Sequence, residues 1–417
     1  MKKKVFIVAI ILLASFGGLY GRTKPLPLDA SAEECWNIIA PYFKPPAKYE
    51  NDFGPHKPVL TFYNGTPVKT AKDWERRRAE IRKQFEEMMG TWPALIDKPK
   101  IEYVSKKEKE GYVQHTVKVT LVPDWDPWTS YLLMPEGTGP FPAAVTTYYY
   151  PEGPLRHKKS GYARELAKQG FAVLAIGRAS DYDRHSPRSI IKLPPHLKGT
   201  HCFWPSREDT KLAPLSFRGY AAANAYNALA SLKEVDSRRI GIVGHSYGGK
   251  WALFASCLYE KFACAVWSDP GVTIFNPKHG NGNYWARGYL GAKLSQTGTS
   301  AYRQIKKRGH DLHELIALMA PRPFMVSAVQ AGPDPEEEHT DKPIRWRALN
   351  HIVAVNKLLG WENRLAMTND RPGHRPTRKA LKQTLAFFVY FLKHGKVLES
   401  SAGIKGTGKA DSKGGRS

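Results

Sequence analysis

One segment near the middle of the chain constrains the fold more than any other. The apolar run at 240–243 is followed at once by Gly244-His245-Ser246-Tyr247-Gly248, and then by a helical stretch at 250–260. A G-x-S-x-G sequence between a strand and a helix is typical of a sharp turn, in which the two glycines leave room for crowded backbone. Such a turn presents one serine at the carboxyl edge of a sheet. We therefore predict that Ser246 is a nucleophile; the alternative is a glycine turn with an inert serine.

Apolar runs and amphipathic stretches alternate on both sides of this turn. The predicted strands are 112–122, 129–134, 141–150, 171–176, 240–243, 262–267, 324–329 and 364–368. The predicted helices are 161–170, 216–235, 250–260, 312–319, 346–359 and 377–394. This order favours the α/β class, with a mostly parallel central sheet and helices on both faces. The two leading strands have no helix between them and therefore predict an antiparallel edge.

The first residues have the pattern of an export signal. Three lysines precede the apolar stretch at 5–14, and small residues follow before Arg22. This order predicts a signal peptide over 1–21 and a secreted or periplasmic protein. An uncleaved anchor is the rival, but the apolar run is shorter than the roughly 20 residues that span a bilayer. We expect no integral membrane association once the signal has been removed.

Three further regions are expected in the mature chain. Residues 22–99 are predicted to form an N-terminal extension, in which 22–70 are Pro-rich and irregular. One helix is predicted at 70–89, because Trp74, Ile81 and Phe85 recur at helical spacing. Residues 100–396 form the predicted catalytic domain. Residues 397–417 lack apolar periodicity and predict a disordered basic tail.

Charge and cysteines limit the partners. The 417 residues carry a net charge of +25, which attracts polyanions in general. The chain has neither zinc-finger spacing nor a basic amphipathic helix, so we expect no nucleic-acid partner. Four cysteines (Cys35, Cys202, Cys257 and Cys264) can form disulfides after export or remain buried thiols, and they match no zinc motif.

A serine hydroxyl needs a base, and the base needs an orienting acid. His374 follows the strand 364–368 and precedes the last helix, which suits the base. Two carboxylates suit the acid: Asp334 follows the strand 324–329, and Asp269 follows the strand 262–267. Asp334 is slightly favoured, because it lies one strand before the base, which is the usual position of the acid, whereas Asp269 lies one strand earlier. The other aspartate would then only stabilise a turn.

Further residues are predicted around the nucleophile. The backbone N–H of Tyr247 suits an oxyanion donor, and a second donor is expected near Tyr149, after the strand 141–150. Lys250, Trp204 and Trp285 are candidates for substrate binding, because Lys250 lies in the first helical turn and both tryptophans lie in long loops. Solvation of Lys250 and ordinary loop packing of the rings are the alternatives. Arg287 lies in the same long loop as Trp285.

Three segments carry a resemblance to a known superfamily. They are 244–250 around the serine, 310–323 leading into a strand, and 371–374 before the final helix. From about residue 100 to 394 the chain resembles the α/β-hydrolases, and more narrowly the secreted bacterial glucuronoyl and acetyl xylan esterases. The resemblance implies a substrate role for Lys250 and favours Asp269 as the acid. Tyr247 stands where glucuronoyl esterases carry an arginine.

These features predict a serine ester hydrolase that acts through an acyl-enzyme on an esterified carbohydrate or a small ester. This chemistry requires neither a metal nor an organic cofactor. One alternative is a serine peptidase of the prolyl-oligopeptidase type, although such enzymes usually carry a propeller before the hydrolase domain. Another is a non-catalytic glycan-binding protein that kept the fold.

Overall fold

The computed structural model describes residues 23–155, 161–177, 204–205, 210–273, 309–330 and 341–397. The predicted signal peptide and all but the first residue of the predicted tail lie outside these ranges. In the described part of the chain, no helix is long and apolar enough to cross a membrane.

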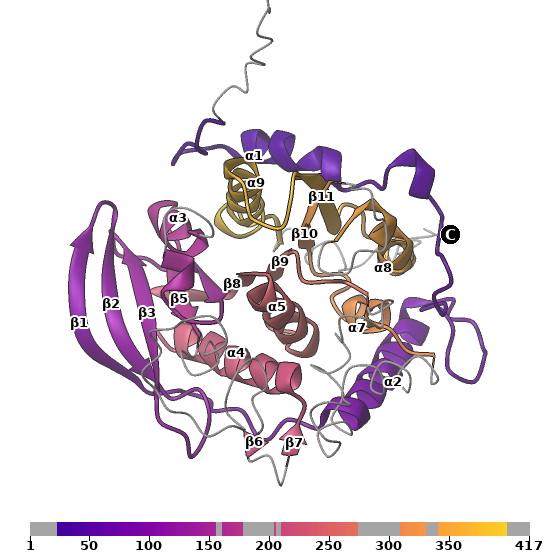
Figure 1. Ribbon diagram of the computed structural model, residues 1–417, viewed down its shortest axis with the longest axis horizontal. Helices are drawn as coiled ribbons and strands as arrows, with labels where there is room; N and C mark the ends of the chain where they lie inside the picture. The colour runs from indigo at the N-terminus through magenta and orange to yellow at the C-terminus, as the bar shows by residue number, and fades with distance from the viewer. Residues whose placement is uncertain are drawn as a thin grey trace, which may run out of the picture.

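A central sheet organises the molecule (Figure 1). Its nine described strands lie in the order β1-β2-β3-β5-β4-β8-β9-β10-β11. The last six in this order are parallel, and β1, β2 and β3 form an antiparallel edge joined to β5. The strands are β1 Ile101–Lys109, β2 Tyr112–Val119, β3 Trp128–Pro135, β4 Phe141–Thr147, β5 Ala172–Ile176, β8 Val235–His245, β9 Cys264–Ser268, β10 Phe324–Val329 and β11 Leu365–Arg371.

The mostly parallel sheet predicted from the sequence is confirmed, and its antiparallel edge has one more strand than predicted. In β1, every residue after Ile101 is exposed. A strand with both faces in water needs no apolar alternation, so its sequence lacks the signal by which strands are recognised.

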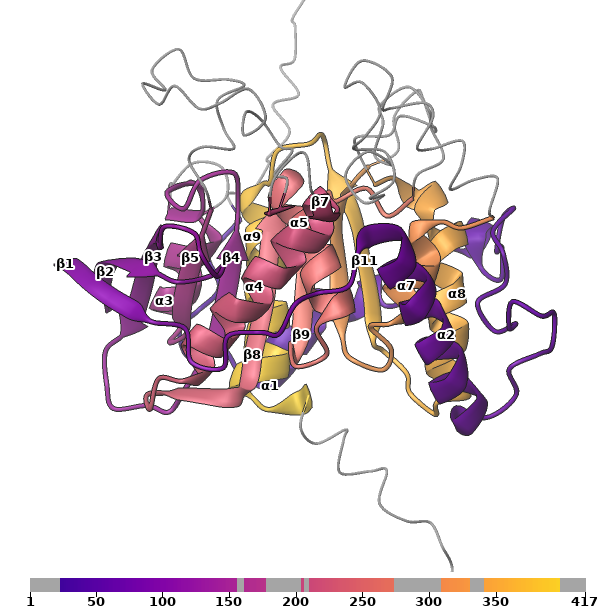
Figure 2. The same cartoon turned by 90° about the horizontal axis from the view of Figure 1, so that it is seen from below.

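Helices cover both faces of the sheet (Figure 1). One face carries α3 and α9, with α1 packed on α9; the other carries α4, α5, α7 and α8, with α2 packed on α7. Figure 2 shows the same layers from the side. The helices are α1 Ala32–Ile39, α2 Ala71–Met89, α3 Tyr162–Lys168, α4 Pro214–Ala230, α5 Tyr247–Leu258, α7 Leu312–Ala317, α8 Trp346–Leu358 and α9 Arg378–Phe388.

The N-terminal extension contains two α-helices, not the single one predicted. The missed helix, α1, begins at a capping box: the Ser31 side chain accepts from the Glu34 N–H at 3.1 Å, and Glu34 accepts from the Ser31 N–H at 2.7 Å. Its buried residues, Cys35 and Ile39, belong to the same apolar cluster as α9. The helix is short, and packing against α9 supplies the stability that its length cannot.

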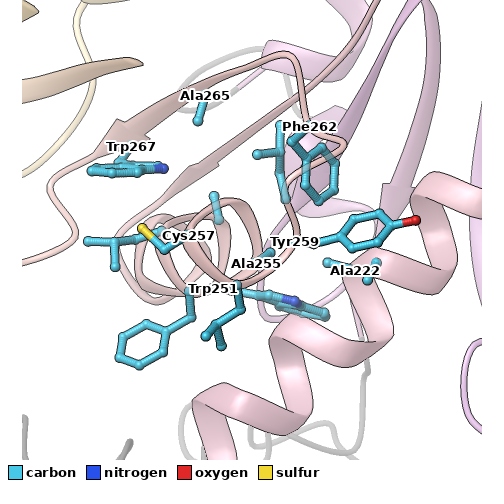
Figure 3. Packing of buried hydrophobic residues seen from close by; sticks show 14 of the residues in the cluster. Ala222, Trp251, Ala255, Cys257, Tyr259, Phe262, Ala265 and Trp267 are labelled. Carbon is cyan, nitrogen blue, oxygen red and sulfur yellow. The ribbon is translucent and has the colours of Figure 1, made fainter. Parts of the chain in front are cut away.

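The helix behind Ser246 is buried almost entirely. Every residue of α5 except Lys250 is buried, because α5 packs on β8 and β9 of the sheet and lies beside α4 and α7. Figure 3 shows Trp251 and Cys257 of α5 near Trp267 of β9 and Ala222 of α4. The Trp267 ring stacks on Phe324 of β10 at 4.5 Å. A helix fixed on all sides holds its first turn, and therefore Ser246, in a defined place.

The described cysteines are free thiols. Cys35, Cys257 and Cys264 are buried and unpaired. Cys202 lies outside the described residues. Burial raises the pKa of the Cys35 thiol to about 11, and it also raises the pKa values of Cys257 and Cys264. These side chains therefore pack as small apolar groups.

Candidate active site

Ser246 occupies a strained turn between β8 and α5. Its φ is 57° and its ψ is −120°, a conformation that non-glycine residues rarely adopt. The two flanking glycines permit this turn. A Cβ on Gly244 would lie 2.2 Å from the Gly248 carbonyl oxygen, and one on Gly248 would lie 2.1 Å from the Thr147 carbonyl oxygen. No other residue type fits these two positions without moving backbone.

The predicted serine and histidine lie within hydrogen-bond distance of each other. His374 Nε2 is 2.9 Å from Ser246 Oγ, although 128 residues separate them in the chain. His374 is 43% exposed at its side chain, so this pair is open to solutes. On its other side, His374 Nδ1 lies 2.7 Å from Asp269 Oδ2.

The carboxylate bonded to His374 is thus Asp269, at the end of β9. Asp334, which its position one strand before His374 slightly favoured, lies outside the described residues. Asp269 is fully buried at its side chain, and its φ of 53° places it in the left-handed region. Its N–H donates to the Ser327 carbonyl at 3.1 Å, so the end of β10 supports this conformation.

Asp341 is a second buried carboxylate beside Asp269, and the sequence analysis did not single it out. The Asp341 N–H donates to Asp269 Oδ1 at 2.8 Å. Its carboxylate accepts from the N–H groups of Gly271 and Val272, at 3.0 and 2.8 Å. Burial and the neighbouring charge of Asp269 raise the pKa of Asp341. Asp341 therefore fixes the loop that carries Asp269 rather than contacting His374.

The two residues predicted for an oxyanion site lie next to the serine. Tyr247 is the first residue of α5, and its ring stacks on Tyr149 with centroids 5.2 Å apart. Thr147 Oγ1 donates to the Gly248 carbonyl at 2.8 Å, which brings the loop after β4 against the start of α5. A developing negative charge on this side would face the N-terminus of α5.

The predicted substrate-binding residues are only partly placed. Lys250 lies one turn after the serine and donates from Nζ to the Pro270 carbonyl at 2.5 Å. A small recess beside Lys250 is lined by Leu215, Leu253 and Leu312. Trp204 lies in a short strand, Trp204–Pro205, but its side chain is not described. Trp285 and Arg287 lie outside the described residues.

Two basic residues that the sequence analysis did not assign to the site also adjoin the triad. His245 is buried, with Nδ1 2.9 Å from Ser268 Oγ, and its ring lies 4.7 Å from that of His374. Burial, followed by the nearby His374 and Arg371, lowers its pKa well below the usual value, so the ring is neutral. Arg371, fully buried, lies 3.3 Å from Asp269 Oδ2. Within the described ranges, no cluster of His, Cys, Asp and Glu could hold a metal ion.

The arrangement can deprotonate a hydroxyl and stabilise the resulting imidazolium. His374 can accept the Ser246 proton at Nε2 while Nδ1–H stays bonded to Asp269. The three residues come from the carboxyl ends of β8, β9 and β11, which meet at one edge of the sheet. The order Ser246, Asp269, His374 along the chain is the order of this fold.

Comparison with known proteins gives one matching family model and several similar solved structures. The prolyl oligopeptidase family matches residues 222–327, a range that includes Ser246 and Asp269. No curated protein matches the sequence. Among solved structures, a glucuronoyl esterase from Solibacter usitatus has a TM-score of 0.61 at 19% identity, covering 83% of this chain and 98% of that one.

Two further glucuronoyl esterases of carbohydrate esterase family 15 are similar. The one from Teredinibacter turnerae T7901 has a TM-score of 0.59 at 18% identity, covering 87% of this chain and 99% of that one. The one from Caldicellulosiruptor kristjansonii has a TM-score of 0.56 at 20% identity, covering 82% and 91%. The chain therefore has the fold of the α/β-hydrolase superfamily, and it is similar in structure to glucuronoyl esterases.

Proposed function

We propose that the protein is an exported serine ester hydrolase that acts through an acyl-enzyme on esterified carbohydrate. The observation that carries this proposal is the continuous hydrogen-bonded series Ser246 Oγ, His374 and Asp269, with separations of 2.9 and 2.7 Å. The basic start and the apolar stretch at 5–14 support export.

The reaction follows from this geometry. His374 Nε2 takes the hydroxyl proton as Ser246 Oγ attacks the ester carbonyl, and Asp269 stabilises the imidazolium. Backbone N–H groups at the start of α5, with Tyr247 first, receive the oxyanion. His374 then protonates the oxygen of the departing alcohol, and the acyl group remains on Ser246. Water, deprotonated by the same imidazole, releases the acid and restores Ser246.

The class of substrate is inferred from two features. The similar solved structures are titled glucuronoyl esterases, and Lys250 and its recess lie one helical turn from Ser246. Tyr247 and Tyr149 present stacked rings where the resemblance expects a guanidinium. We therefore expect acetylated sugars to be hydrolysed at least as fast as methyl glucuronate esters.

The test is a panel of acetyl-xylan, methyl glucuronate, feruloyl and aryl esters, assayed with the wild type and Ser246→Ala. We expect hydrolysis and fluorophosphonate labelling by the wild type, and neither by Ser246→Ala. Asp269→Asn should lower kcat by about 10³–10⁴-fold, because the imidazole loses its orienting carboxylate. Asp334→Asn is the matched comparison and should retain most activity. A loss confined to Asp334→Asn would overturn the assignment of the acid.

A peptidase is the second candidate, because the matched family is that of prolyl oligopeptidase. The acyl chemistry would be the same, with an amine as the leaving group. Prolyl peptide and ester substrates, assayed side by side, separate the two. Faster turnover of the peptides would replace the esterase proposal with this one.

A further inference from the structure

The guanidinium of Arg371 contacts both Asp269 and the turn that carries His374. Arg371 is the last residue of β11 and is fully buried. Its Nε donates to the Ala328 carbonyl at 3.1 Å, and NH2 donates to the Ser327 carbonyl at 2.8 Å. Its NH1 donates to the His374 backbone carbonyl at 2.9 Å. One rigid, planar group thus joins the end of β10 to the turn that carries His374.

The same guanidinium completes the surroundings of Asp269. Oδ2 of Asp269 is shared between His374 Nδ1 at 2.7 Å and Arg371 NH2 at 3.3 Å. Oδ1 accepts the N–H of Asp341 at 2.8 Å. A fully buried carboxylate needs a nearby cation when its histidine is neutral, and Arg371 is in place at every stage of the reaction. The strained φ of Asp269 makes this support more necessary.

Arg371 also acts on the second imidazole. Its NH1 lies 3.4 Å from Ser268 Oγ, which is 2.9 Å from His245 Nδ1. Burial, His374 and Arg371 lower the pKa of His245, so its ring stays neutral. The positive charge formed during the reaction is therefore confined to His374, whose ring lies 4.7 Å away.

We propose that Arg371 is a positioning residue. Its planar set of N–H donors aligns Asp269 with the turn that carries His374, and its positive charge balances the buried charge of Asp269 while His374 is neutral. This inference rests on the proposed function, since it assigns a role in the same chemistry. Two properties of the Arg371 side chain can be tested separately: the planar array of N–H donors and the positive charge. Lysine keeps the positive charge without the planar array of donors, and methionine removes both.

The experiment compares Arg371→Lys and Arg371→Met with the wild type. The readouts are the rate of Ser246 labelling by a fluorophosphonate and kcat and KM for an aryl acetate, each from about pH 5 to pH 9. Arg364→Lys is the matched control, because Arg364 is also buried, just before β11, but packs over Trp361 at 4.3 Å. Circular dichroism reports folding of each variant.

We expect Arg371→Lys to lower kcat and the labelling rate by about 10–100-fold, with KM within about twofold and the acidic limb of the pH profile unmoved. Arg371→Met should show the same loss and an acidic limb about one pH unit higher, because removal of a buried cation favours protonation of the site. If Arg371→Met does not fold, the loss in Arg371→Lys decides.

The inference is overturned if Arg371→Lys labels and turns over at the rate of Arg364→Lys, or if the acidic limb of a folded Arg371→Met stays where the wild type has it. A wild type that labels but hydrolyses no ester contradicts the proposed function alone, and the labelling rates still test Arg371. A wild type that never labels contradicts both.

Discussion

Three buried histidines join the N-terminal extension to α7 and α8, and they make stability sensitive to acid. The rings of His56 and His313 have centroids 4.7 Å apart, and those of His313 and His351 are 4.9 Å apart. His313 Nε2 donates to the Lys57 carbonyl at 2.7 Å, and His351 Nε2 lies 3.3 Å from the Phe53 carbonyl. Each contact ties a segment of the extension to the hydrolase domain.

The surroundings of this cluster oppose a positive charge. Burial, followed by charges on neighbouring residues, lowers the pKa of His56 and of His313 to about 3. Burial also lowers the pKa of His351. Arg345 and Arg347 add to the effect on His56, while Glu314 opposes it at His313 and His351. All three imidazoles are therefore neutral in the folded protein near neutral pH.

The sign and size of the effect follow from linkage. An unfolded histidine takes up its proton near pH 6.5, whereas folded His56 and His313 do so near pH 3. Between these values the unfolded chain binds more protons, so stability is full above pH 6.5 and falls as the pH is lowered toward 3. From pH 7 to pH 5 each of the two residues removes about 2 kcal/mol, or about 4 kcal/mol together. That is a large share of a typical free energy of unfolding.

Urea unfolding at pH 7 and pH 5 tests this prediction, with wild type, His313→Gln and His115→Gln. Glutamine can still donate to the Lys57 carbonyl but does not titrate. We expect His313→Gln to lose about 2 kcal/mol less than the wild type between the two pH values. His115 is partly exposed on β2, beside the edge strand β1, and burial and Lys106 lower its pKa less than burial lowers that of His313. Its variant should therefore follow the wild type more closely than His313→Gln does. Equal losses in the wild type and in His313→Gln would refute the reasoning.

Three further changes are expected to act through contacts that the structure defines. Glu314→Gln should lower the free energy of unfolding by about 2 kcal/mol in urea titrations, because buried Arg77 loses one of its two carboxylate partners and keeps only Glu80. Gly248→Ala should abolish fluorophosphonate labelling, because its Cβ would lie 2.1 Å from the Thr147 carbonyl; labelling at the wild-type rate would contradict this. Thr70→Ala should lower the melting temperature by a few degrees, equivalent to about 1 kcal/mol, because α2 loses its N-cap.

The sequence contained enough to predict the sheet and the position of Ser246 because both depend on local pattern. Buried parallel strands are continuous apolar runs, and G-x-S-x-G between a strand and a helix needs no distant information. α2 was equally readable: Thr70 caps it, and Trp74, Ile81 and Phe85 are buried as their spacing predicts. The capping box formed by Ser31 and Glu34, which marks the start of α1, is also a local sequence signal.

The choice of acid could not be made locally. Asp269 and Asp334 both follow a buried strand, and the sequence does not say which carboxylate lies against the histidine. That depends on the left-handed φ of Asp269, which aims its carboxylate toward the turn after β11. Arg371 was missed for a similar reason. The predicted strand ended at residue 368, before Arg371, and only the pairing of β11 with β10 brings its guanidinium to Asp269.

The N-terminal extension is hydrogen-bonded to the end of β11, just before the turn that carries His374. Asp370, directly before Arg371, accepts from Tyr42 Oη at 2.9 Å and from Gln383 Nε2 at 2.8 Å, and it pairs with Lys379 at 2.8 Å. Tyr42 follows α1, while Gln383 and Lys379 lie on α9. The end of β11 is thus held by the extension and α9 through Asp370, and by β9 and β10 through Arg371. Since His374 follows three residues later, the extension contributes to the placement of the imidazole without contacting it.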